Sequence, residues 1–118
     1  MNEVAQLLEP IAPSVEGEVR SRLGGFLGGM IRAYLPQTWV FSTDRGTASL
    51  VVDPDGRTHV VPAAAPGPDV TIELPYDRLK AALATRRPGA VPPGAMRVKS
   101  HTAKGRTAFD YLRSRLGL

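Results

Sequence analysis

The stretch that decides the fold is Pro68–Leu83, with the sequence PDVTIELPYDRLKAAL. Its first part alternates apolar and polar side chains, the period of two expected of a strand with one buried face. Pro75 ends this strand because it has no N–H for a sheet ladder. The period then becomes helical, with an apolar stripe at Tyr76, Leu79, Ala82 and Leu83. A second alternating segment, 96–99, follows. We therefore expect a right-handed strand–helix–strand crossover between parallel strands, around which the rest of the chain packs.

Helices are predicted at the start of the chain. A short amphipathic helix is expected over 4–11, stopped by nearby prolines. Ser14 is a candidate cap for a longer helix, whose apolar stripe runs over 15–34. Inside this stripe lies GGFLGG (24–29), and each glycine costs up to about 1 kcal/mol of helix stability relative to alanine. These glycines indicate close backbone contact, a kink or a break.

Three strand candidates come next, over 38–43, 47–52 and 57–61. The segments between them, Asp44–Gly46 and Asp53–Gly56, carry the turn residues of hairpins. We therefore expect three antiparallel strands before the crossover.

The end of the chain predicts one more helix. The segment 85–94 holds three prolines and two glycines and is not expected to form a regular helix. After the second strand of the crossover, Thr102 is a candidate cap for a final helix that ends at Gly117. The apolar side of this helix consists of Ala108, Tyr111, Leu112 and Leu116, with Phe109 beside them.

The order and spacing of these motifs resemble the C-terminal half of the sterol carrier protein type 2 (SCP-2) lipid-binding domain. The matching residues are Asp69, Thr71, Ile72, Asp77, Leu79, Ala82, Leu83, Gly94, Met96, Arg97 and Val98. The resemblance implies an α+β fold, a five-stranded mixed sheet covered on one face by helices. One SCP-2-like domain would then span 1–118, with N-terminal helices over 1–36 and the sheet, crossover and C-terminal helices over 37–118. The proline-rich segment departs from the family, whose members commonly have a short helix with an aromatic residue there. Ser100-His101 also stands where relatives tend to carry Gly followed by Asp or Asn.

Composition and charge reduce the number of functional classes that the sequence could represent. The 118 residues include no cysteine, so neither disulfides nor thiolate chemistry is expected. The N-terminal residues include Glu3 and Glu9 without a basic run, which does not indicate a signal peptide, and we expect a cytoplasmic protein. Residues 1–77 carry a net charge of −5 and residues 78–118 a net charge of +9. This split favours either an anion-facing surface or a merely solvated one.

Most catalytic and cofactor chemistry finds no support in the sequence. Two distant histidines without cysteine make a zinc site improbable, and neither a metal nor a cofactor is expected. Ser100 and His101 are neighbours in a strand, so their side chains point apart, and nothing marks an oxyanion hole. The basic final helix places its aromatic residues on the apolar side, which argues against nucleic-acid binding.

The remaining chemistry is apolar. Aromatic and methionine residues at such spacings usually form only a core, but SCP-2 domains hold a lipid in a tunnel between sheet and helices. The residues that the resemblance would place at such a cavity are Phe26, Met30, Tyr34, Trp39, Phe41, Ile72, Leu74, Met96, Phe109 and Leu112. Cations that would meet a headgroup or phosphate are Arg86, Arg87, Arg97, Lys99 and Lys104.

We therefore expect non-enzymatic binding or transfer of a lipid or other apolar small molecule, with an anionic membrane surface or a partner enzyme as further partners. One alternative is a cyclase- or isomerase-type enzyme that uses the same cavity, for which Tyr34, Tyr111 and His101 are the titratable candidates. The other is an accessory protein-interaction subunit.

Overall fold

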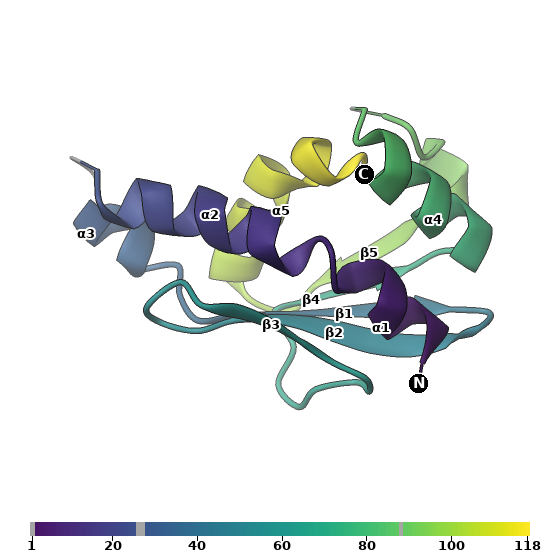
Figure 1. Cartoon of the computed structure of the whole chain (residues 1–118), viewed down its shortest axis with the longest axis horizontal. Coiled ribbons are helices and arrows are strands. Elements are labelled where there is room, and N and C mark those ends of the chain that lie inside the picture. Colours follow the sequence, from purple (N-terminus) through teal and green to yellow (C-terminus); the bar gives the residue numbers. More distant parts are fainter. Residues whose placement is uncertain (1, 26–27, 88) are drawn as a thin grey trace.

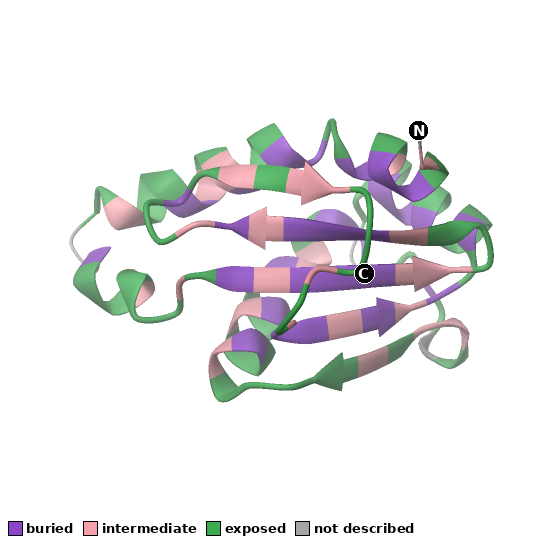
Figure 2. Cartoon of the chain, turned by 90° about the horizontal axis from the view of Figure 1, so that it is seen from below, coloured by how far each residue is buried: buried purple, intermediate pink, exposed green. Residues whose placement is uncertain are grey.

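Five strands form one mixed sheet in the computed structural model, in the order β3-β2-β1-β4-β5 (Figure 2). The structure describes residues 2–25, 28–87 and 89–118. The strands are β1 (Gln37–Thr43), β2 (Gly46–Val52), β3 (Thr58–Val61), β4 (Val70–Glu73) and β5 (Arg97–Ser100). Helices cover one face of this sheet (Figure 1), which confirms the predicted α+β fold class.

The first three strands form two antiparallel hairpins, as predicted. The β1–β2 register runs from Gln37 opposite Val52 to Thr43 opposite Gly46. Gly46 has a φ of 129° and Gly56, in the β2–β3 turn, has a φ of 91°. Glycine adopts this positive-φ region without the steric cost that a Cβ brings, so both turns depend on the glycine found there.

The predicted parallel crossover between β4 and β5 is wrong, because these two strands are antiparallel, with Glu73 opposite Arg97. The helix that follows β4 is α4 (Tyr76–Thr85), and its ten residues span about 15 Å. The segment 86–96 then brings the chain back to the end of β4 at which it left the sheet. Among the described residues of this segment, the one regular element is a short 3-10 turn, η1 (Pro93–Ala95). The parallel partner of β4 is β1.

The N-terminal helices differ from the expected pair. Helix α1 (Glu3–Leu8) is capped by Asn2, whose Oδ1 accepts a hydrogen bond from the Val4 N–H at 2.8 Å. Helix α2 (Ala12–Leu23) begins two residues before Ser14, so the predicted Ser14 cap is wrong. Pro13 lies in the first turn of α2, where a missing N–H costs no helical hydrogen bond.

The apolar stripe over 15–34 is divided between two helices, α2 and α3 (Gly28–Arg32). Helix α2 ends at Leu23, directly before the glycine run, and this confirms the break, one of the three possibilities that the sequence left open. Gly28 lies against the backbone carbonyl of Leu23, and a Cβ there would collide with it. The absence of a side chain therefore lets α3 fold back closely against the end of α2.

A buried aspartate fixes the last helix, α5 (Ala103–Leu112), against the sheet. The predicted Thr102 cap is confirmed, since its Oγ1 accepts from the Gly105 N–H at 3.0 Å. The same hydroxyl donates to Asp69 Oδ1 at 2.7 Å, and Asp69 Oδ2 accepts from the Thr38 N–H at 2.9 Å. A Cβ on Gly105 would lie 2.6 Å from the Asp69 carbonyl oxygen, so only glycine permits this approach. The chain then continues as a 3-10 segment, η2 (Arg113–Leu116).

The two faces of the sheet are covered differently (Figures 1 and 2). The helices and the sheet enclose one apolar core. On the other face the β3–β4 connection is held by Ser49, whose hydroxyl donates to the Ala63 carbonyl at 2.7 Å and accepts from the Ala65 N–H at 2.9 Å. Among the described residues, no helix is both long and apolar enough to cross a membrane.

Candidate functional site

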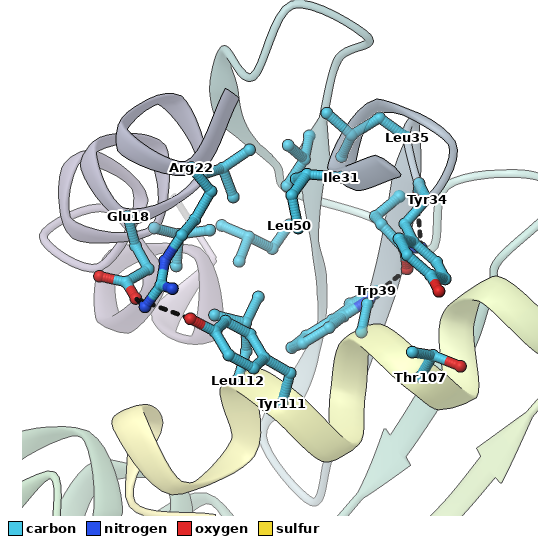
Figure 3. A pocket seen from close by; sticks show the side chains of 15 residues that line it. Glu18, Arg22, Ile31, Tyr34, Leu35, Trp39, Leu50, Thr107, Tyr111 and Leu112 are labelled. Carbon is cyan, nitrogen blue, oxygen red and sulfur yellow. Dashed lines mark hydrogen bonds and ion pairs between the residues drawn. The ribbon is translucent and has the colours of Figure 1, made fainter. Parts of the chain in front are cut away.

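An apolar pocket of about 220 Å³ lies between α2, α5 and the helix-covered face of the sheet (Figure 3). Helices α1 and α4 contribute none of its lining residues. Its walls are Val15, Glu18, Val19 and Arg22 from α2; Ile31, Tyr34 and Leu35 from α3 and the residues after it; Gln37, Trp39, Leu50 and Val52 from β1 and β2; and Thr107, Ala108, Tyr111 and Leu112 from α5. The pocket is therefore assembled from segments that lie far apart in the sequence.

The indole of Trp39 forms one wall of the pocket and is held in place by Gln37. The Trp39 Nε1–H donates to Gln37 Oε1 at 2.9 Å, and Gln37 Nε2 donates to the carbonyls of Tyr34 at 2.6 Å and Lys104 at 3.1 Å. Gln37 is only 3% exposed, and these bonds use both ends of its amide. Trp39 also meets the ring of Phe109 edge to face, at a centroid distance of 5.4 Å. One buried amide thus sets the position of the largest side chain in the pocket.

Charged residues gather where α2 meets α5. Glu18 Oε1 lies 3.2 Å from Arg22 Nη2 and 3.0 Å from Arg115 Nε, and it accepts a hydrogen bond from the Tyr111 hydroxyl at 3.4 Å. The guanidinium carbons of Arg22 and Arg115 lie 5.2 and 4.5 Å from the centre of the Tyr111 ring, within cation–π range. We call these four residues the mouth cluster. The cluster connects α2 to α5 across the pocket, and three of its members line the pocket (Figure 3).

The side chains that line the pocket from the two helices include short ones. Val15 on α2 and Ala108 on α5 both line it, and neither is long enough to fill the space. The break after Leu23 ends α2, so the segment that follows contributes Ile31 and Leu35 as a side wall. A volume larger than a methyl group is usually filled in a protein core, so a hollow of this size needs an explanation.

Three of the residues expected at a cavity line the pocket: Tyr34, Trp39 and Leu112. Four others are buried in the core without lining it, namely Phe41, Ile72, Leu74 and Phe109. These four belong to β1, the β4 segment and α5, where neighbouring side chains cover them fully. A strand or helix position that faces the core does not by itself show whether the space beside it is filled.

The remaining members of that set lie elsewhere. Met30, in α3, is 62% exposed and is not among the residues that line the pocket. Met96 is partly buried against the core, outside the pocket. Phe26 lies outside the described residues. The described residues of the proline-rich segment are not among those that line the pocket, and Val91 of this segment is buried in the core.

The predicted headgroup cations do not form one site, and none of them lines the pocket. Arg86 donates to Ser14 Oγ at 3.2 Å, and Arg87 is exposed. Lys99 pairs with Glu73 at 3.7 Å across β4 and β5, and Arg97 lies exposed on β5.

The fifth of these cations, Lys104, binds groups of the protein itself. Its Nζ lies 3.7 Å from the buried carboxylate of Asp69 and donates to the Pro36 carbonyl at 2.6 Å.

The mouth cluster was not predicted from the sequence. Glu18 and Arg22 have the i, i+4 spacing of a helical ion pair, which was the available signal for half of it.

Neither histidine of the chain is among the residues that line the pocket. His101 is exposed, and its Nε2 is 2.9 Å from the Thr71 hydroxyl. Within residues 2–25, 28–87 and 89–118, no three histidine or acidic side chains are grouped as metal ligands.

Comparisons with known proteins agree on the fold. The UbiJ-SCP2 ubiquinone synthesis protein superposes with a TM-score of 0.52 at 13% identity, over 92% of this chain and 96% of its own. The sterol carrier protein domain 2 of Helicoverpa armigera gives a TM-score of 0.54 at 12% identity, over 95% of this chain and 90% of its own. The chain therefore has the fold of an SCP-2 domain, and the resemblance read from the sequence is confirmed at that level.

Longer proteins contain a similar segment. A double mutant of the sec-alkyl sulfatase PisA1 matches 65% of this chain with a TM-score of 0.50 and 20% identity. The chain spans 13% of that enzyme and 13% of the parent sulfatase from Pseudomonas sp.. No protein-family model matches the sequence. No curated protein matches it either.

Proposed function

We propose that this protein binds, and can carry, a small apolar molecule in the pocket between α2, α5 and the sheet. The observation that supports this most is the pocket itself, about 220 Å³ in volume and lined mainly by aliphatic and aromatic side chains. Moving an alkyl group from water into such a site is worth about 0.8 kcal/mol per CH₂. A ligand with several carbons needs no strong polar contact to be retained.

The fold supports the same proposal. Two of the structural neighbours are named as SCP-2 proteins, one of them as a sterol carrier protein domain. From this likeness of fold we infer the same kind of role for this chain, the binding of an apolar ligand.

The enzymatic alternative would need a titratable group free to act inside the pocket. Tyr34 and Tyr111 line the pocket, whereas His101 does not. Tyr111 is engaged with Glu18, and Glu18 is engaged with two arginines. A carboxylate held in this way is better suited to bracing two helices than to moving a proton, which favours binding over catalysis.

The test uses Trp39, the only tryptophan in the chain, as a built-in probe. The protein is titrated with 1-octanol while the tryptophan fluorescence is recorded. We expect a saturable change that is lost in Ala108→Leu, because the added side chain occupies the pocket. The same substitution at the exposed Ala81 on α4 is the matched control and keeps the response. No saturable response in the unmodified protein, or an unchanged response in Ala108→Leu, would contradict the proposal.

A further inference from the structure

The charges of the mouth cluster do not balance. Its single carboxylate, Glu18, is paired with two guanidinium groups, those of Arg22 and Arg115. Glu18 is also the only acidic side chain among the residues that line the pocket. The cluster therefore carries one net positive charge at the edge of an otherwise apolar space.

The arginines of the cluster can still offer hydrogen-bond donors. A guanidinium carries five N–H groups in a fixed fork and pairs readily with a carboxylate. The side chain of Arg22 lines the pocket and is 47% exposed, so it is in reach of both a ligand and water. Stacking of both guanidinium groups on the Tyr111 ring holds them at this edge instead of leaving them free in solvent.

The volume limits the size of the apolar part of a ligand. An apolar cavity of about 150 Å³ in another protein accommodates benzene, with its six carbons. With the same volume for each ligand atom, the pocket of about 220 Å³ accommodates about nine non-hydrogen atoms. A sterol has far more atoms than that, and a long acyl chain would leave much of its length outside.

We propose that the ligand is a compact amphipathic monoanion, with an apolar body of about nine non-hydrogen atoms in the pocket and a carboxylate-type head held by Arg22 and Arg115. One net positive charge matches one negative charge, so a monoanion neutralises the mouth without leaving an excess of either sign. This inference rests on the proposed function, since it names the class of ligand for the same pocket.

The experiment compares octanoate with 1-octanol, which have the same chain length and differ in head-group charge. Tryptophan fluorescence titrations at neutral pH and low salt should show octanoate binding about five- to tenfold more tightly, a preference that corresponds to roughly 1 kcal/mol or slightly more. The preference should shrink as salt is added, because the arginines are partly exposed. Dodecanoate should gain little over octanoate, and a sterol should bind more weakly than either.

Variants locate the head-group site. Arg22→Gln should remove most of the preference for octanoate over 1-octanol, and Arg22→Lys should retain part of that preference. Arg78→Gln on the exposed face of α4 is the matched control and should change neither affinity. Circular dichroism of each variant checks that it is folded.

The outcomes separate the two proposals. If neither compound binds, the proposed function itself fails. If both bind equally well, or if Arg22→Gln retains the full octanoate preference, the pocket binds apolar ligands but the monoanion inference is overturned.

Discussion

The two ends of the helix–sheet interface use similar residues but are filled to different degrees. At the end near the β1–β2 turn, α1 and α4 lie over the sheet, and Leu8, Phe41 and Leu79 have no exposed surface at all. At the other end, α2 and α5 leave the pocket open beside Trp39 and Leu50. The same sheet face thus provides a packed core and a hollow side by side.

This difference indicates that the pocket results from where α2 and α5 lie over the sheet, and not from the types of residue at that end. Leu50 and Leu79 are both buried leucines, yet only the first borders empty space. The two ends should therefore respond differently to the same substitution, and the first two predictions below apply one change to both ends.

The largest loss of stability is expected for removal of a leucine side chain. Leu79→Ala at the packed end should lower the free energy of unfolding by an amount near the upper part of the usual range of about 2–5 kcal/mol. Leu50→Ala should cost about 1 kcal/mol less, because one side of Leu50 already borders a void and has fewer contacts to lose. Urea denaturation measures both. Equal costs would indicate that the two ends are equally packed.

Enlarging a side chain should reveal the same contrast between the two ends, with a smaller loss of stability at the packed end. Ala82 on α4 is 1% exposed, so Ala82→Leu should destabilise the protein by about 1–3 kcal/mol through overpacking. Ala108→Leu extends into the pocket and should leave the free energy of unfolding unchanged within about 0.5 kcal/mol or raise it slightly. Thermal unfolding of both variants decides the matter, and a strongly destabilised Ala108→Leu would mean that the pocket is not available space.

A pair of glycine substitutions compares a helix position packed against the sheet, on α5, with an exposed helix position, on α2. Gly105→Ala should destabilise by about 1–3 kcal/mol, because the new methyl group meets the backbone of Asp69. Gly17→Ala, at an exposed position of α2 with nothing within 4 Å, should instead stabilise by up to about 1 kcal/mol. Chemical denaturation of the two variants gives opposite signs if α5 rests on Asp69 as described, and the same sign if it does not.

Much of the fold could be predicted from the sequence because its signals are local. Turn residues around Gly46 and Gly56 indicated the hairpins, and Thr102 indicated the start of α5. The direction of β5 could not be read in this way, since the alternation of Met96 to Lys99 is the same for parallel and antiparallel neighbours. The return of segment 86–96 decides that direction.

The candidate site was less predictable because it depends on distant pairings. Tyr34, Trp39 and Leu112 were expected at a cavity and do line the pocket. The mouth cluster, by contrast, joins Glu18 to Arg115, nearly a hundred residues later in the chain. No sequence period reports such a pairing, nor the distance at which two helices leave space between them.

The most direct test of the central claim is a nuclear magnetic resonance titration of isotope-labelled protein with 1-octanol. The account predicts saturable shifts for the Trp39 indole N–H and for the methyl groups of Leu50 and Leu112. It predicts no change for the methyl groups of Leu8 and Leu79 at the packed end. Shifts that are absent, or that are spread equally over both ends, would contradict the claim that one end of this core is built to receive a ligand.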